Sequence, residues 1–130
     1  MSASGNAQRH ERGYQLFSKG EFEELVELFA PDIVWHATGR NPYSETRRGR
    51  EEVVEFFATI LEVSGGTFNL DAQEFIGNGT HSAALYRVTA DRDGRSLDAT
   101  ACEVCRWDNG RLAEHWFYVD DLYAWDEFWS

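Results

Sequence analysis

The chain has 130 residues and a mass of 14.9 kDa, which leaves room for one compact domain, because globular domains hold roughly 100–200 residues. Hydrophobic residues make up 42% of the chain and charged residues 27%, which is enough apolar side chain for a buried core and excludes a disordered protein. Acidic residues outnumber basic ones 23 to 12, and the formal net charge of -11 repels phosphate backbones and anionic membrane surfaces, so we expect no nucleic-acid partner and no membrane partner.

The beginning of the chain is predicted to be helical. Apolar and semi-apolar residues recur at helical spacing from residue 7 to Phe17, and Gly20 ends this first helix, because glycine accepts a left-handed conformation. A second, short helix starts at Phe22, carries its apolar residues at helical spacing, and stops at Pro31.

A short strand and a third helix follow. Residues 33–37 form a β-type run, and residues 38–48, which contain glycine, proline and polar side chains, are predicted to form a loop. Gly49 opens the third helix, where two glutamates in the first turn favour the positive end of the helix dipole, and Gly65-Gly66 closes it. The apolar residues of this helix recur at helical spacing, so one of its sides is expected to be buried.

The second half of the chain changes to the period of strands. Four long β-type runs are separated by turns rich in asparagine, aspartate and glycine: residues 67–76, 81–90, 96–107 and 112–119. Successive strands joined by tight turns form an antiparallel meander, so we predict a single α+β domain over residues 1–130, with three N-terminal helices packed on one face of the sheet. The aromatic tail, residues 120–130, is expected to pack against the rest of the domain.

Six short landmarks appear in a characteristic order along the chain: Gly-Glu at 20–21, Pro-Asp-Ile-Val-Trp-His at 31–36, Arg-Gly-Arg at 48–50, Asp-Asn-Gly-Arg at 108–111, Glu-His-Trp at 114–116 and Asp-Leu-Tyr at 121–123. Together with the order of helices and strands they resemble the NTF2-like superfamily, and in particular its SnoaL-like branch of polyketide cyclase and ketosteroid isomerase relatives. The resemblance covers the chain from about residue 7 to Trp129.

This resemblance implies a cone in which a curved sheet and the helices enclose a funnel lined by apolar and aromatic side chains. It implies a small apolar carbonyl compound as the ligand, proton-transfer chemistry of the isomerase, cyclase or dehydratase type, and no cofactor. The superfamily also contains proteins without any chemistry, so the fold by itself does not assign a function.

The comparison with ketosteroid isomerase leaves the register of the first strand open. A gapless match places the basic aspartate of that enzyme at Ala37, whereas a match anchored on Gly39 places it at His36. A shift of one residue exchanges the two faces of a strand. We expect His36 to point into the funnel as a proton acceptor, because SnoaL-like chains often carry a histidine there and a neutral imidazole accepts protons near neutral pH. The alternative places His36 on the outer face, beside a loop.

Asp121 is the second predicted catalytic residue. SnoaL-like cyclases place an acid/base aspartate after a tryptophan near this point, and Trp116 supplies that landmark. Asp120 lies next to it, so the spacing favours Asp121 without excluding its neighbour. The alternative is that both acids form a solvated helix cap.

The alignment with the isomerase also places Glu103 and His115 side by side in the funnel, with Phe117 pointing in the same direction. Burial would raise the pKa of Glu103, unless it pairs with His115 or an arginine. The alternative is that Glu103 lies on the outward face of the sheet. His10 and His81 are interpreted as surface residues.

Two tyrosines are candidates for hydrogen bonds to a ligand, Tyr14 from the first helix and Tyr43 from the loop, although core packing is an equally good interpretation of both. The remaining predicted wall residues are aromatic: Phe17, Trp35, Phe56, Phe57 and Phe117.

No segment approaches the ~20 consecutive apolar residues of a membrane helix, and residues 1–6 lack the basic end and apolar core of a signal peptide, so we expect a cytoplasmic protein. Cys102 and Cys105 have CxxC spacing but lie in one predicted strand, where residues three apart point to opposite faces. We therefore expect no redox pair and no metal site.

Two further functions remain open. One is a non-catalytic module that binds a ligand in the funnel and forms a homodimer through the open sheet face. The other is water activation of the epoxide-hydrolase type, which needs an Asp-Arg-Asp arrangement, with Arg87 as the arginine if its strand directs it inward.

Overall fold

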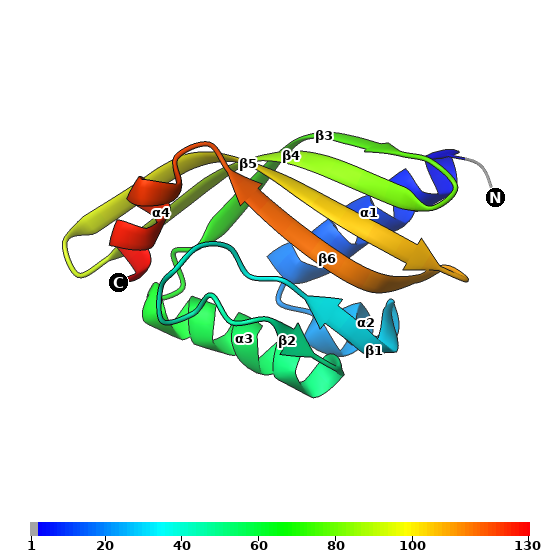
Figure 1. Cartoon of the computed structure of the whole chain (residues 1–130), viewed down its shortest axis with the longest axis horizontal. Coiled ribbons are helices and arrows are strands. Elements are labelled where there is room, and N and C mark those ends of the chain that lie inside the picture. Colours follow the sequence, from blue (N-terminus) through cyan, green and yellow to red (C-terminus); the bar gives the residue numbers. More distant parts are fainter. Residues whose placement is uncertain (1–2) are drawn as a thin grey trace.

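The computed structural model describes residues 3–130 and contains four helices and six strands in that range. The elements in chain order are α1 (Ala3–Ser18), α2 (Phe22–Glu27), β1 (Phe29–Trp35), β2 (Arg47–Arg48), α3 (Arg50–Val63), β3 (Asn69–Gly77), β4 (His81–Arg92), β5 (Arg95–Asp108), β6 (Arg111–Val119) and α4 (Leu122–Trp129). Figure 1 shows these elements with α1 behind the long strands and α3 along one side. None of the described helices is both long and apolar enough to cross a membrane.

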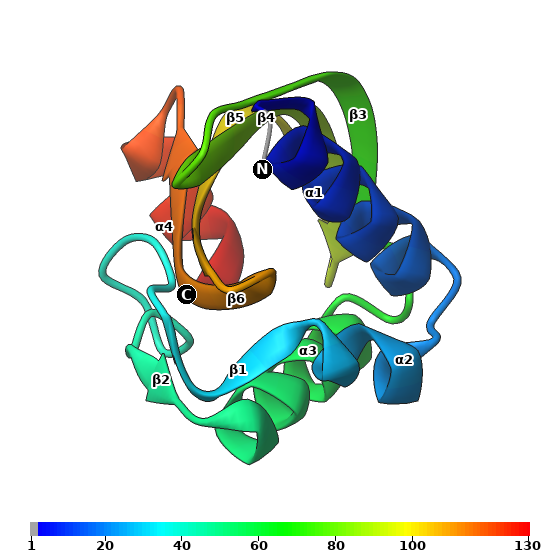
Figure 2. The same cartoon turned by 90° about the vertical axis from the view of Figure 1, so that its right-hand side faces the viewer.

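The strands form one sheet in the order β2-β1-β6-β5-β4-β3. The predicted meander from β3 to β6 is confirmed, and the α+β class with it. The prediction of a purely antiparallel sheet is wrong at one place, because β1 runs parallel to β6. Seen from the side, the sheet is curved, with α1 across from β6 and α3 next to β1 (Figure 2).

Two tight turns set the register of the meander. Asp93 and Gly94 have φ angles of 49° and 80°, and Asn109 and Gly110 have φ angles of 51° and 78°. Two consecutive positive φ angles define the turn type that matches the twist of a hairpin, and Asp-Gly and Asn-Gly are the preferred sequences for it. The residues on either side of the Asp93-Gly94 turn pair directly with each other. This pairing fixes which side chains of β4 and β5 point inward and which point outward along both strands.

The boundary between the second helix and the first strand differs from the prediction. Helix α2 ends at Glu27, and β1 starts at Phe29, so Pro31 lies within the strand instead of ending the helix. The strand tolerates this proline because its pairing with β6 shifts between Phe29 and Val34, and proline occurs in strands at such irregularities.

The three predicted N-terminal helices are confirmed, and the aromatic tail forms a fourth helix that was not predicted. The side chain of Asp121 caps α4 by accepting a hydrogen bond from the backbone N–H of Ala124 at 3.1 Å. Trp125, Phe128 and Trp129 are buried and belong to a core cluster with the inward-facing residues of β4 and β5. The expectation that the tail packs against the domain is confirmed.

Candidate functional site

The sheet and the helices enclose a hollow with a cavity volume of about 120 Å³. Its wall consists mainly of aromatic and aliphatic side chains from α1, α3, the sheet, the loop at 36–46 and α4. Tyr14 and Tyr43 line it, and so do all the aromatic wall residues named from the sequence: Phe17, Trp35, Phe56, Phe57 and Phe117. Their contact with a ligand stays a prediction.

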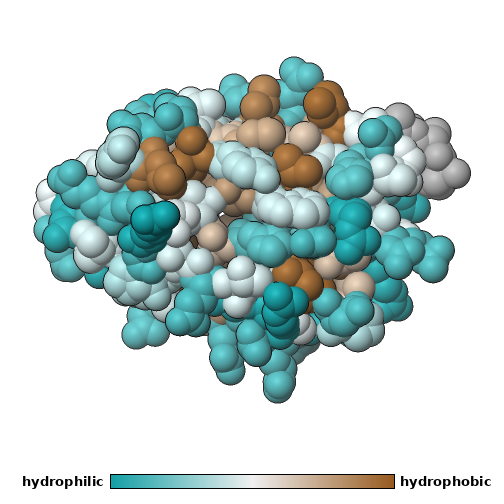
Figure 3. Space-filling model, viewed as in Figure 1, coloured by the Kyte–Doolittle hydropathy of each residue, from teal (hydrophilic) through white to brown (hydrophobic). Residues whose placement is uncertain are grey.

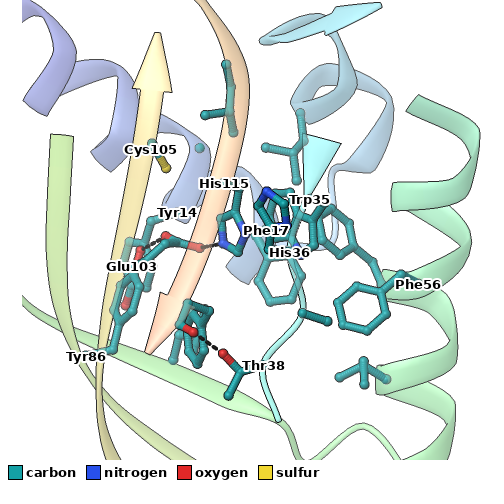
Figure 4. Close-up of a pocket in the computed structure, with 18 of the residues that line it drawn as sticks. Tyr14, Phe17, Trp35, His36, Thr38, Phe56, Tyr86, Glu103, Cys105 and His115 are labelled. Atoms are coloured by element: carbon teal, nitrogen blue, oxygen red, sulfur yellow. Dashed lines mark hydrogen bonds and ion pairs between the residues drawn. The ribbon is translucent and has the colours of Figure 1, made fainter. Parts of the chain in front are cut away.

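A carboxylate lies inside this apolar wall. Glu103 points inward from β5, and only 9% of it is exposed. Its Oε1 atom accepts hydrogen bonds of 2.7 Å from the hydroxyl of Tyr86 on β4 and from Nε2 of His10 on α1. Its Oε2 atom accepts a third, also of 2.7 Å, from Nε2 of His115 on β6 (Figure 4). Three elements of the fold therefore meet at one carboxyl group.

The hydrogen-bond network continues beyond His10. Nδ1 of His10 lies 2.7 Å from the hydroxyl oxygen of Ser82, which accepts a hydrogen bond of 2.8 Å from Nε1 of Trp107. An ionised carboxylate only accepts hydrogen bonds, so Nε2 of His10 carries the proton that points to Glu103. This assignment follows from the network, because ring hydrogens are inferred from their partners.

The charges in this cluster follow from burial and hydrogen bonding. Burial opposes ionisation of Glu103, but attraction to the His115 ring and hydrogen bonds from His10 and His115 outweigh it, so the pKa of Glu103 is lowered. Burial lowers the pKa of His115, against the attraction of Glu103. Burial, with the charge of Glu103 beside it, raises the pKa of Tyr86 well above its usual value. Glu103 is therefore held as a carboxylate, next to a histidine whose neutral form is favoured by burial and a tyrosine that keeps its proton.

His115 is held firmly in place. The indole of Trp35, its pairing partner on β1, stacks on the imidazole with ring centroids 3.4 Å apart and planes 8° from parallel. The neutral ring donates Nε2–H to Glu103, so Nδ1 carries the lone pair. Nδ1 is buried and has no hydrogen-bond partner among the residues that the structure describes.

A metal would not fit this cluster as it stands. His10, Glu103 and Cys105 offer donor atoms that all lie within 4.8 Å of one another. However, His10 Nε2 and Glu103 Oε1 are 2.7 Å apart, whereas two ligands of a tetrahedral zinc ion lie about 3.4 Å apart. Burial also raises the pKa of the Cys105 thiol, so its sulfur stays protonated at neutral pH. The arrangement is that of a hydrogen-bonded network.

His36 is among the residues that line the hollow, but its imidazole is turned to the outer face of the sheet, so the predicted inward direction of this side chain is wrong. Its Nε2 pairs with Oε2 of Glu114 at 2.7 Å, and its ring stacks on Trp116 at 5.6 Å between centroids. Glu114 and Trp116 flank His115 on β6, so they lie on the opposite face of that strand. Trp35 takes the inward position of β1, and the alternation of the strand turns His36 outward.

The two acids after β6 are also remote from Glu103. Asp121 is exposed and caps α4, and Asp120 is exposed and accepts a hydrogen bond from the backbone N–H of Thr100. Neither lines the hollow. The predicted convergence of His36, Asp121 and Glu103 is therefore not found, and the helix-cap alternative describes Asp121.

Three residues of the cluster were missed or misplaced by the sequence interpretation. His10 is 4% exposed, not on the surface, and its helical spacing with Tyr14 and Phe17 was the available signal. Ser82 and Tyr86 lie at the inward positions of β4, where they alternate with outward residues. The alternation of the sequence could have predicted their direction as well. His81 is partly exposed, and its Nδ1 bonds the hydroxyl of neighbouring Thr80.

Arg87 does not reach the interior. Its guanidinium pairs with the exposed Asp98 at 2.7 Å on the outer face of the sheet. The Asp-Arg-Asp arrangement of the epoxide-hydrolase alternative is therefore not formed around this arginine. Cys102 and Cys105 are both free, and they lie on opposite faces as predicted, with Cys105 buried.

Comparisons with known proteins agree on the family and on the fold. The model of the SnoaL-like domain family matches residues 10–115. An uncharacterized protein of Mycobacterium bovis, Mb0035, is 26% identical over 120 residues, which is 92% of both chains. The structure of Bal32a, from a soil-derived mobile gene cassette, is 35% identical with a TM-score of 0.94 and covers 98% of both chains. TerC, co-crystallized with polyporic acid, is 20% identical with a TM-score of 0.83 and covers 95% of this chain and 97% of its own.

Proposed function

The chain belongs to the SnoaL-like domain family, and from this premise we propose that it binds a small apolar carbonyl compound in the hollow and takes a proton from it with the Glu103–His115 pair. The observation that carries the proposal is the buried Glu103 carboxylate bonded to His115 inside an apolar wall. The reaction class is proton transfer of the isomerase, cyclase or dehydratase type. The proposal moves the acid–base role from His36 and Asp121 to two residues that the sequence placed in the ligand-binding wall.

The proton acceptor in this proposal is His115. Glu103 holds its Nε2–H at 2.7 Å, which leaves the Nδ1 lone pair as the basic site. The lowered pKa keeps the ring unprotonated at neutral pH, as a base requires. After the proton arrives, the imidazolium lies against the Glu103 carboxylate, and this attraction stabilises the charge that the transfer creates.

The oxygen that gains charge in the substrate needs a donor, and Tyr14 supplies one. Its hydroxyl lies in the wall of the hollow and accepts a hydrogen bond of 3.4 Å from the backbone N–H of Ala72. The phenolic proton is then free to donate to a substrate oxygen. Tyr86 is occupied, because its proton is given to Glu103.

The wall supports a ligand with much apolar surface. Aromatic side chains dominate it, and polar groups are few, which is typical of sites for small organic molecules. TerC, which shares the fold, was co-crystallized with the small molecule polyporic acid. We therefore extend small-molecule binding to the hollow of this chain.

Hydrogen exchange into a simple carbonyl compound tests the chemistry. We would follow the loss of the C1 hydrogen signal of 2-tetralone in D2O by NMR, with and without the protein. We expect the protein to accelerate exchange over buffer, and Glu103→Gln to lose about 100-fold of that acceleration, the usual scale of general base catalysis. The matched control is Glu114→Gln, which alters the outward carboxylate and leaves exchange unchanged.

The outcomes separate the two functions left open by the sequence. If tryptophan fluorescence shows that 2-tetralone binds but exchange is not accelerated, the catalytic proposal is wrong and the chain is a binding module. If both variants lose exchange equally, the assignment of the base to Glu103 and His115 is wrong.

The outer face of the sheet supports a further part of the proposal, namely that a second copy of the chain binds there. Leu85, Cys102 and Tyr118 form one row across β4, β5 and β6, and Leu85 and Tyr118 are 45% and 56% exposed. Figure 3 looks onto this side and shows separate hydrophobic residues among hydrophilic and neutral ones. Sedimentation at micromolar concentration should give a dimer, and Tyr118→Lys should give a monomer. A monomeric wild-type protein would contradict this part of the proposal.

A further inference from the structure

The imidazole of His10 has a buried partner at each of its two nitrogens. His10 comes from α1 and is 4% exposed, and the proposed function gives it no role. Its Nε2 lies 2.7 Å from Oε1 of Glu103, and its Nδ1 lies 2.7 Å from the hydroxyl oxygen of Ser82. Ser82 in turn accepts a hydrogen bond from Nε1 of Trp107. The ring is therefore held from both sides, and one of its two bonds ends on the carboxylate of the proposed base pair.

The two oxygens of the Glu103 carboxylate have different donors. Oε1 accepts from His10 and Tyr86, which lie on α1 and β4, whereas Oε2 accepts from His115 on β6. The carboxyl group cannot turn about its Cγ–Cδ bond without breaking the two bonds at Oε1. These bonds therefore fix the direction in which Oε2 faces His115.

His10 also affects how strongly Glu103 attracts a proton on His115. Burial opposes ionisation of Glu103, but the His115 ring and the hydrogen bond from His10 outweigh burial, so the pKa of Glu103 is lowered. Burial is the main cause of the lowered pKa of His115, and repulsion from His10 acts in the same direction. A Glu103 carboxylate without the His10 donor would hold a protonated His115 more tightly, and His115 would take up its proton at a higher pH.

Other titratable or charged side chains surround the pair, namely Arg9 and Tyr14 on α1, His36 after β1, Tyr86 on β4 and Cys105 on β5. Tyr86 and Cys105 keep their protons near neutral pH, because burial raises the pKa of each. Arg9 bonds the side chain of Asn6, and His36 is turned to the outer face. The side chains of α3 and α4 that line the hollow are apolar. Besides His115, His10 is therefore the basic side chain of this set with a direct bond to Glu103.

We propose that His10 is a positioning residue for the Glu103–His115 pair: its Nε2–H holds Oε1 of Glu103, leaves Oε2 to His115, and keeps the His115 imidazole free of a proton near neutral pH. This inference rests on the proposed function and adds a residue of α1 that controls the same site. His10 acts through Glu103, so it needs no contact with a ligand.

Two amide variants separate the nitrogens of His10. The amide nitrogen of glutamine is as many bonds from Cβ as Nε2, so His10→Gln keeps a donor for Glu103 and loses the bond to Ser82. The amide group of asparagine is as many bonds from Cβ as Nδ1, so His10→Asn keeps the contact with Ser82 and loses the donor. Both variants bury an amide in place of the ring, which matches the general cost of the substitution.

NMR titration of the ring nitrogens of His115 in the unliganded protein measures the effect. The chain has four histidines, so each ring signal is assigned by its loss in one His→Gln variant. His10→Asn should move the midpoint of the His115 titration up by about one pH unit, which corresponds to about 1.4 kcal/mol, the scale of a hydrogen bond to a charged group. His10→Gln should leave the midpoint at its wild-type value.

Ser82→Ala is the control for a purely structural role of His10. It removes the partner of Nδ1 and of the Trp107 indole, so it should destabilise the fold and leave the midpoint of His115 in place. The exchange of 2-tetralone should follow the same pattern. The low-pH limb of its rate should move up by about one unit in His10→Asn and stay in place in His10→Gln and Ser82→Ala.

The outcomes distinguish this inference from the function on which it rests. If the midpoint of His115 stays in place in His10→Asn, or moves equally in His10→Gln or Ser82→Ala, the role of His10 is wrong and the proposed function stands. If the wild-type protein does not accelerate exchange, the catalytic proposal fails, and the titration of the unliganded protein still decides whether His10 controls His115. If His10→Asn fails to fold, the wild-type spectrum decides, because a His10 without a proton on Nε2 at neutral pH would overturn the inference.

Discussion

Two carboxylate–imidazole pairs, each with one member on β6, lie on opposite faces of the sheet, and they have the same distance but opposite surroundings. Glu103 and His115 are 2.7 Å apart inside the cone, with side chains 12% and 2% exposed. His36 and Glu114 are also 2.7 Å apart, but on the outer face, with side chains 32% and 26% exposed. The sequence interpretation chose a residue of the outer pair for catalysis.

The difference between the pairs shows that solvent, not pairing distance, decides what such a pair can do. Water screens the outer pair, so its attraction contributes little and a proton taken there is shared with bulk solvent. The inner pair is shielded from water, where each charge depends on its hydrogen-bond partners. Only the inner pair can present a base of defined protonation to an apolar ligand.

The largest predicted effect contrasts the carboxylates themselves. Glu103→Ala should lower the free energy of unfolding by about 3–5 kcal/mol, because it leaves the buried donors of His10, His115 and Tyr86 without an acceptor. Glu114→Ala should cost no more than about 1 kcal/mol, as expected for a solvent-screened pair. Urea denaturation monitored by tryptophan fluorescence measures both. If both variants lost the same free energy of unfolding, burial would not make the inner pair more important for stability than the outer pair.

The pH dependence of stability should also distinguish the inner pair from the outer pair, with a smaller change in the free energy of unfolding. The pKa of His115 is lowered from its usual 6.5 in the folded state, so the unfolded chain binds the proton first as the pH falls. The free energy of unfolding should therefore decrease below pH 6.5, with a slope of about 1.4 kcal/mol per pH unit, until the pH reaches the pKa of the folded state. The pKa of Glu103 is also lowered, so a second decrease should begin below its usual 4.5.

Denaturation in urea at several pH values between neutral and about pH 4 measures this profile. His115→Gln should flatten the decrease that begins below pH 6.5, whereas Glu114→Gln should retain it. A decrease of the same size in His115→Gln would show that another group causes it.

The smallest predicted effect concerns Asp121, which the sequence interpretation proposed as a catalytic acid. Its side chain caps α4, so Asp121→Ala should cost about 1 kcal/mol of stability, the usual value of a helix N-cap. It should leave the exchange of 2-tetralone unchanged, and Asp121→Asn should restore the stability. Loss of exchange in the stable Asp121→Asn protein would return Asp121 to the catalytic site.

The sequence predicted the helices and strands well where periodicity and turns were strong. The Asp-Gly and Asn-Gly turns and the alternation of residues 81–90 and 96–107 led to the correct meander. The resemblance to ketosteroid isomerase then implied the inward direction of Glu103 and His115, with an outward Glu103 as the alternative. The SnoaL-like resemblance was confirmed by the match over residues 10–115.

The same reasoning failed where long-range geometry was needed. The direction of His36 depends on a pairing shift between Phe29 and Val34, which no periodicity in seven residues reveals. His10 was identified as part of a helical stripe but not as a buried partner, because its acceptor Glu103 is 93 residues away.

The sequence by itself determined the class of fold and the meander of long strands, because local periods and turn chemistry carry that information. The family followed from the resemblance of its landmarks. The tertiary structure decided which imidazole lies beside the buried carboxylate. A strand turns its side chains to opposite faces at every residue, so the docking of β1 beside β6 exchanges Trp35 and His36 between the hollow and the solvent.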